Sequence, residues 1–146
     1  GYDKNEVVVF LDDHQSFLDR IALIYDLGIK KVLYEDNYPP SQGDCLSPKK
    51  LLSFEDYIID KPHNKTYHSF SYVDYDLFDS YVETYEEFPP IFKLEKTRWG
   101  DDWNETNYPT EDAWLDDSYA KEFPLLYSEA GYYTWICLLN FRETKR

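Results

Sequence analysis

The sequence predicts an α+β fold in one compact domain, residues 1–146, with a mixed sheet and three to four helices. Five apolar residues from Val7 to Leu11 have the β-branched and aromatic composition of a buried strand. Apolar residues then recur at helical spacing from Phe17 to Tyr25, and a second apolar stretch covers residues 29–34. Strand and helix patterns do not alternate strictly after that point, which favours α+β over a parallel α/β fold.

The N-terminal third is predicted to form a strand–helix–strand unit. Residues 6–11 form the first strand, and either Asp12 or Asp13 caps the helix that follows, since a carboxylate accepts bonds from N-terminal amides. Gly28 stands where this helix is expected to end, because glycine is common just past a helix C-terminus. Residues 29–34 form the second strand.

The middle of the chain combines a loop, a short helix and a strand. Proline and glycine mark residues 36–47 as a loop, and Ser47-Pro48 has the cap and first-turn proline of a helix start. A short helix follows, although residues 54–59 fit a strand equally well. Alternating aromatic positions predict another strand over residues 68–72.

The second half is predicted to contain two helices and two strands. Apolar residues at helical spacing predict a helix over residues 77–88, with Asp74 or Asp76 as its cap. Residues 91–99 alternate as a strand does, and residues 100–109 form a polar loop. A helix is then expected from Thr110 to Phe123, and the last strand from Tyr132 to Phe141.

Negative charge is concentrated in residues 71–123, which hold 15 acids and 4 bases in a chain of net charge −14. Such a field repels phosphate backbones, so direct nucleic-acid binding is disfavoured. It accelerates encounter with a basic protein by roughly ten- to a thousandfold at low salt. The alternative is an acidic face that only keeps the protein in solution.

Composition also bears on the compartment and on the cysteines. The longest apolar runs are far shorter than a membrane span, and no signal-peptide pattern is visible, so we expect a cytoplasmic protein without a membrane partner. In that compartment Cys45 and Cys137 are expected to be free thiols. A single bridge between them is the alternative, although two cysteines are too few for a disulfide framework.

No catalytic motif is present. The chain lacks a nucleophile elbow, a phosphate-binding loop and a dinucleotide fingerprint, and it has only five glycines. His14, His63 and His68 do not have the spacing of a metal site with each other or with the cysteines. We therefore predict no catalytic residue, no metal and no cofactor, and a protein that is not an enzyme.

The segment VVVFLDDHQSFLDRI nevertheless resembles the start of a response-regulator receiver domain. The resemblance implies that Asp12 and Asp13 hold Mg²⁺, a cation that binds one or two carboxylates plus phosphate and water. It also implies a third strand in FEDYIID, with Asp60 as the phosphoryl acceptor. The resemblance covers about 60 residues, because no hydroxyl residue at the end of a fourth strand and no Lys-Pro at the end of a fifth is assigned in residues 61–146. Helix capping by Asp12 and Asp13 is the alternative.

Aromatic and acidic residues are interleaved in the most negative stretch, and this pattern predicts a binding surface. Tyrosine and tryptophan provide rigid contact area with a polar handle, and acids beside them pair with lysine and arginine of a partner. Tyr81 and Tyr85 fit core packing better. The predicted partner-binding residues are Trp99, Asp101, Asp102, Trp103, Glu105, Tyr108, Glu111, Asp112, Trp114, Asp116, Asp117, Glu83, Glu86 and Glu87.

These observations lead to a functional hypothesis. We expect an acidic protein that neutralises a basic protein partner, a toxin or a nucleic-acid-binding enzyme, and most concretely an immunity protein that inhibits a bacterial nuclease toxin. A DNA mimic that blocks a restriction enzyme and a receiver-like, Mg²⁺-dependent phosphotransfer domain are the alternatives.

Overall fold

A computed structural model describes residues 3–143 of the chain, which separate into two compact units. The sheet unit comprises residues 1–86 and 137–146, and the insert unit comprises residues 87–136 between its last two strands. The predicted α+β class is confirmed, because the described residues contain four α-helices, a mixed four-stranded sheet and a two-stranded sheet. The predicted single-domain organisation stays a prediction.

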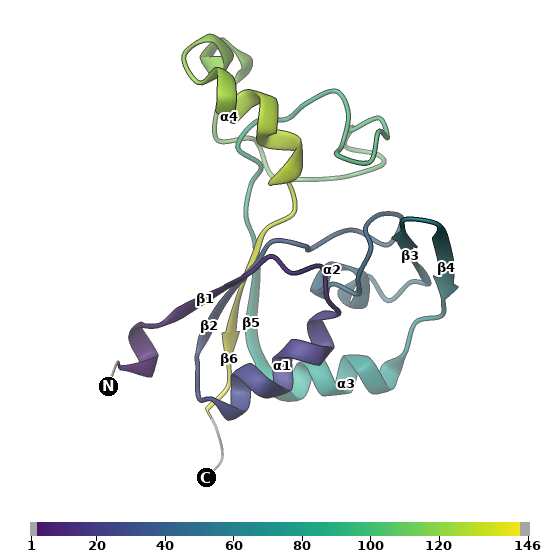
Figure 1. The fold of residues 1–146 in the computed structure, drawn as a ribbon, viewed down its shortest axis with the longest axis vertical. Helices are drawn as coiled ribbons and strands as arrows, with labels where there is room; N and C mark the ends of the chain where they lie inside the picture. Colours follow the sequence, from purple (N-terminus) through teal and green to yellow (C-terminus); the bar gives the residue numbers. More distant parts are fainter. Residues whose placement is uncertain (1–2, 144–146) are drawn as a thin grey trace. The chain divides into compact units, whose positions relative to one another are not determined.

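The four-stranded sheet has the order β1-β2-β6-β5 (Figure 1). Its strands are β1 Val8–Leu11, β2 Lys31–Tyr34, β6 Cys137–Phe141 and β5 Val82–Glu87. β1 and β2 pair in parallel, and β2 pairs with β6 in antiparallel orientation. Because parallel strands end at the same edge, the residues that follow β1 and those that follow β2 are brought together.

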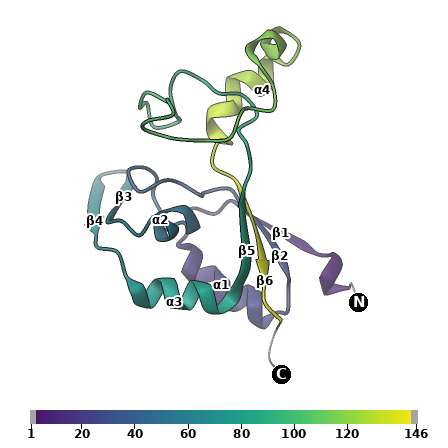
Figure 2. The same ribbon diagram turned by 180° about the vertical axis from the view of Figure 1, so that it is seen from behind.

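Two helices, α1 Phe17–Asp26 and α3 Tyr72–Tyr81, lie on the same side of this sheet in both views (Figures 1 and 2). The Phe17 ring packs on Tyr34 of β2 at 5.3 Å between centroids and on Phe78 of α3 at 5.8 Å. The core of the sheet unit forms between helices and sheet from side chains that are almost fully buried, namely Phe17, Ile21, Ile24, Val32, Tyr34, Phe78, Leu139 and Phe141.

The strand–helix–strand prediction is confirmed by β1, α1 and β2, but the predicted cap is wrong. Helix α1 begins after Ser16, so neither Asp12 nor Asp13 stands at its N-cap. A short loop separates the aspartates from the helix, and Asp13 instead pairs with Arg20 at 2.7 Å. Asp12 is therefore not committed to the helix and faces His14 instead.

The predicted helix over residues 77–88 is wrong in its second half. Helix α3 starts earlier, with Ser71 as its cap, and ends at Tyr81, where strand β5 begins. The side chain of Asn140 in β6 donates a hydrogen bond to Thr84 of β5. Neighbouring β6 in the sheet overrides the local helical spacing of this segment.

The prediction of a short helix at Ser47-Pro48 is confirmed by α2, Pro48–Leu52, whose Ser47 side chain accepts a bond from the Lys50 amide. Strand β3, Tyr57–Lys61, pairs with β4, Asn64–His68, in a separate hairpin. The predicted strand over residues 68–72 is wrong, because Tyr72 already belongs to α3.

The insert unit contains little regular structure. It has helix α4, Pro124–Glu129, and two short 3₁₀ segments, Asp117–Lys121 and Ala130–Tyr132. The predicted strand over residues 91–99 is reduced to one bridge between Lys96 and Asp102, and the predicted helix over residues 110–123 is wrong. In residues 110–123 the amides of Trp114 and Leu115 instead donate to the carbonyls of Pro90 and Ile91.

Aromatic rings form the core of the insert unit. Trp135 packs against Trp103 and Tyr108, each at 6.0 Å between centroids. Phe92 is fully buried and meets Tyr127 of α4 at 5.1 Å. These ring contacts provide the packing that a longer sheet or helix would otherwise supply.

Cys45 and Cys137 are buried free thiols, as predicted. Among the residues that the structure describes, none of the helices combines the length and the apolar composition needed to cross a bilayer.

Candidate functional site

All eleven carboxylates of the insert unit are exposed, including the predicted partner-binding acids within it. Several of them make local contacts. Asp101 accepts a hydrogen bond from Tyr108 at 3.0 Å, Asp102 pairs with Lys96, and Glu105 pairs with Lys93. The Asp102 carboxylate raises the pKa of Lys96.

The other predicted acids of the insert unit are Glu87, Glu111, Asp112, Asp116 and Asp117. Asp116 caps a 3₁₀ segment through Ser118, and these hydrogen bonds lower its pKa. Within residues 3–143, the side chains of Glu111 and Asp112 make no hydrogen bond or ion pair. They are therefore the acids best placed to test an interface without disturbing the fold.

The four predicted aromatic residues separate into two pairs. Trp103 and Tyr108 are only 6% and 7% exposed, so their rings serve the core and offer little surface to a partner. Trp99 is 36% exposed and Trp114 is 65% exposed. Of the four predicted aromatic residues, only Trp99 and Trp114 therefore expose enough of their rings to contact a partner.

Large exposed apolar side chains accompany the acids of the insert unit. Leu125 of α4 is 72% exposed. The insert surface, as we name it, consists of the exposed acids of residues 87–136 together with Trp99, Trp114, Tyr119, Phe123, Leu125, Leu126, Tyr132 and Tyr133. Glu83 and Glu86 are also exposed but belong to β5 of the sheet unit.

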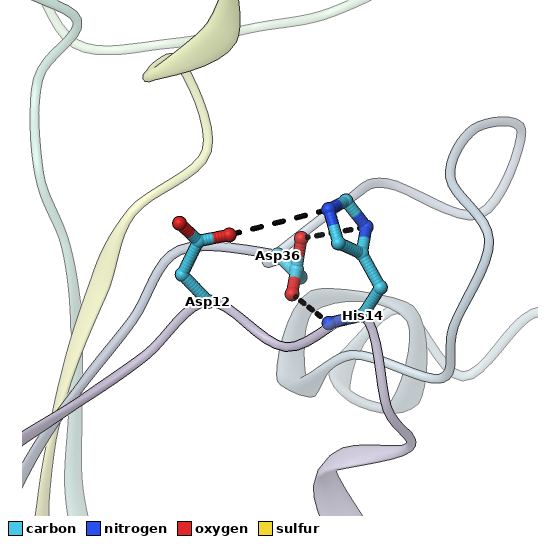
Figure 3. A group of neighbouring side chains, drawn as sticks. All are labelled: Asp12, His14 and Asp36. Atoms are coloured by element: carbon cyan, nitrogen blue, oxygen red, sulfur yellow. Dashed lines mark hydrogen bonds and ion pairs between the residues drawn. The ribbon is translucent and has the colours of Figure 1, made fainter.

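A second cluster of polar groups lies in the sheet unit, where β1 and β2 end. Asp12 follows β1 directly, and Asp36 comes two residues after β2. Their carboxylates turn toward the ring of His14 from different sides (Figure 3). One donor atom from each of the three residues lies within 4.8 Å of the other two, a spacing that suits a metal ion. We call these residues the DHD cluster.

Hydrogen bonds fix His14 at the centre of the DHD cluster. Its backbone amide donates to Asp36 Oδ2 at 2.9 Å, and its Nδ1 lies 3.1 Å from Asp44 Oδ1. Its Nε2 is 4.0 Å from Asp12 Oδ1. His14 has a φ of 52°, a left-handed conformation that places amide and ring against the same aspartate.

Asp36 is not among the site residues predicted from the sequence, and only the receiver resemblance implied any metal ligand. A signal was present, because Glu35-Asp36 follows the second predicted strand as Asp12-Asp13 follows the first. Of the residues implied by the receiver resemblance, Asp12 alone belongs to the cluster. A strand does form where the resemblance implies one, but β3 pairs with β4 in a separate hairpin, and its Asp60 pairs with Lys65 at 3.6 Å.

Buried titratable groups surround the loop that carries Asp36 and Asp44. Lys50 is fully buried, and its ammonium donates to the carbonyls of Gly43 and Cys45. Burial lowers the pKa of Lys50 to about 8 and raises the pKa of Cys45 to about 12. The hydroxyl of Tyr34 donates to the Gln15 carbonyl, and burial raises its pKa.

A cleft of about 430 Å³ in the sheet unit is lined by Gln15, which follows His14, and by Asp44. Asp44 holds the His14 ring, and the lining also includes Lys61 of β3 and His68 of β4. The His68 ring stacks on Tyr57 at 5.3 Å and bonds Thr66 at 3.0 Å, so its orientation is fixed.

Comparisons with protein-family models, with curated proteins and with solved structures found no match to the chain.

Proposed function

We propose that the protein binds and neutralises a basic protein partner through the insert surface. The observation that carries this proposal is that every acid of the insert unit is exposed and that the same unit also exposes large tryptophan and leucine side chains. The unit has 11 acids and 4 bases within 50 residues, and two of those bases already pair with its own acids.

Charge and rings have separate roles in this proposal. The acids attract a basic partner over a distance of about 10 Å at moderate salt and orient its approach. Trp114 and its exposed neighbours supply the apolar contact that slows dissociation, since aromatic anchors carry much of an interface's binding energy. An acidic surface without exposed rings would only accelerate encounter.

In its most concrete form the partner is a nuclease toxin and the protein is its immunity protein. A nuclease active site is basic because it binds phosphates, and carboxylates of the insert surface would occupy the places of those phosphates. Inhibition then needs no chemistry from the bound protein.

The test uses a panel of purified bacterial nuclease-toxin domains, with binding measured by surface plasmon resonance and inhibition by DNA and RNA cleavage. The variant Glu111→Lys/Asp112→Lys reverses two insert acids whose side chains make no hydrogen bond or ion pair within residues 3–143. Its matched control, Asp26→Lys/Glu55→Lys, changes the net charge equally at exposed positions of the sheet unit.

We expect wild type and control to inhibit at least one nuclease, with association slowed by at least about tenfold in the insert variant at low salt. Loss of inhibition in both variants alike would indicate a general charge effect and reject the insert surface. Failure of wild type to bind any basic nuclease would reject the immunity form.

A further inference from the structure

We propose that the DHD cluster, Asp12, His14 and Asp36, is a binding site for a divalent transition-metal cation, for which Zn²⁺ is the probe. The site lies within the sheet unit and shares no residue with the insert surface. The inference is independent of the proposed function.

The arrangement of the imidazole carries the first step. Because a carboxylate only accepts, the contact between His14 Nδ1 and Asp44 Oδ1 at 3.1 Å places the ring proton on Nδ1. In the neutral ring Nε2 is then the unprotonated nitrogen, the one able to bind a metal, and it lies 4.0 Å from Asp12 Oδ1. That separation is too long for a hydrogen bond, and a small closure of the two side chains would bring both atoms within bonding distance of one ion.

The second step rests on an orphaned atom. Asp36 is fully buried, and its Oδ1 receives no hydrogen bond from the described residues. His14 Nδ1 lies 3.3 Å from this oxygen, but its one proton is directed to Asp44. A buried carboxylate oxygen without a donor is costly, and a bound cation would satisfy it.

Charge balance favours a cation as well. Asp12, Asp36 and Asp44 surround one imidazole, and Arg20 is engaged by Asp13. The nearest buried cation is Lys50, whose ammonium is directed to two backbone carbonyls. A divalent ion offsets the excess negative charge that these residues otherwise concentrate in a partly buried place.

The donor set selects the class of ion. Two carboxylates and one imidazole suit Zn²⁺ or Mn²⁺, whereas Mg²⁺ and Ca²⁺ prefer oxygen ligands alone. Asp44 would not bind the ion itself. It accepts the hydrogen bond from His14 Nδ1 and so orients the ring, as a carboxylate often does for a metal-binding histidine. Three protein ligands leave coordination positions for water, and the Asp12 side chain is 51% exposed, so solvent reaches the site.

The test is calorimetric titration of the full chain with ZnCl₂ at neutral pH and about 150 mM salt, where weak binding to scattered surface acids is screened. The variant is Asp12→Asn, chosen because Asp12 is exposed and its substitution spares the core. The matched control is Asp13→Asn, which removes the neighbouring carboxylate outside the cluster. Circular dichroism verifies that both variants fold, and ¹H–¹⁵N spectra of the imidazoles identify the histidine that binds.

We expect one Zn²⁺ per chain, affinity reduced by at least about tenfold in Asp12→Asn, and unchanged affinity in Asp13→Asn. The ring resonances of His14 should shift on binding, and those of His63 and His68 should not. Equal losses in the two variants, or ring shifts at His63 or His68 alone, would overturn the proposal. Absence of stoichiometric binding in the wild type would overturn it as well.

Discussion

The sheet unit and the insert unit carry the same formal net charge of −7, but they differ in how densely and how deeply their charged side chains are placed. The sheet unit spreads 18 acids and 11 bases over 96 residues and fully buries three of its charged side chains, Asp36, Glu35 and Lys50, at 0–3% exposure. The insert unit has 11 acids and 4 bases in 50 residues and exposes every acid.

This difference indicates two kinds of recognition. A buried charge must be matched by specific partners, so the sheet unit fixes its polar groups in a defined cluster around His14. Exposed charge keeps its hydration and acts at a distance, which suits capture of a macromolecule. The comparison predicts that mutations in the sheet unit change stability and ion binding, and that surface mutations in the insert unit change partner binding.

The largest effect is expected in the core of the sheet unit. Phe17→Ala removes a ring that is 1% exposed and contacts Tyr34 and Phe78, so the free energy of unfolding should fall by about 4 kcal/mol. Urea denaturation measures the change. Leu23→Ala, at a 57% exposed position of the same helix, should cost far less. Similar losses in the two variants would mean that α1 does not pack as described.

A slightly smaller effect is expected in the core of the insert unit. Trp103→Ala deletes a buried indole that packs on Trp135 and should lower the free energy of unfolding by about 3 kcal/mol. Trp114→Ala should change it by only about 0.5 kcal/mol, because that ring is mainly exposed, and should instead weaken partner binding. Tryptophan fluorescence during urea denaturation reports both. A reversed order of the two losses would contradict the separation between core and contact rings.

Lys50 gives the sheet unit a distinct pH dependence. Its pKa is lowered to about 8 in the folded protein from an ordinary value of 10.5, so above pH 8 the unfolded chain binds more protons and stability rises with pH. Cys45 opposes this above its ordinary pKa of 9.0, because its pKa is raised to about 12 in the folded state. The free energy of unfolding should therefore rise by about 1 kcal/mol between pH 8 and 9.

Urea denaturation at those two pH values tests the assignment. Lys50→Met should abolish the rise, and Lys49→Met, at the neighbouring half-buried lysine, should preserve it. If Lys50→Met retains the full rise, another group is responsible for it.

Local patterns predicted the first strand–helix–strand unit because each strand is a short apolar run and the apolar residues of the helix recur at helical spacing. Val82–Glu87 was misassigned because its strand character depends on β6, more than 50 residues later in the sequence. Residues 110–123 were misassigned because backbone bonds to Pro90 and Ile91 outweigh the helical spacing of Trp114, Leu115 and Tyr119.

The same limit applies to the candidate sites. Exposure of the acids in the insert unit follows from composition, since isolated carboxylates are rarely buried. The sequence could not distinguish Trp103, which is buried, from Trp114, which is exposed, because both lie between acids in irregular segments. Asp36 joins Asp12 and His14 only through the parallel pairing of β1 with β2, a contact between distant residues.

The central claim, that the insert surface is where a basic partner binds, is tested most directly by carboxylate footprinting of the complex. Free and nuclease-bound protein are labelled with a water-soluble carbodiimide and an amine, and mass spectrometry quantifies modification at each acid. We predict protection at Glu111, Asp112 and neighbouring acids of residues 87–136, with Asp26 and Glu55 labelled equally in both states. Protection confined to acids of the sheet unit would contradict the claim.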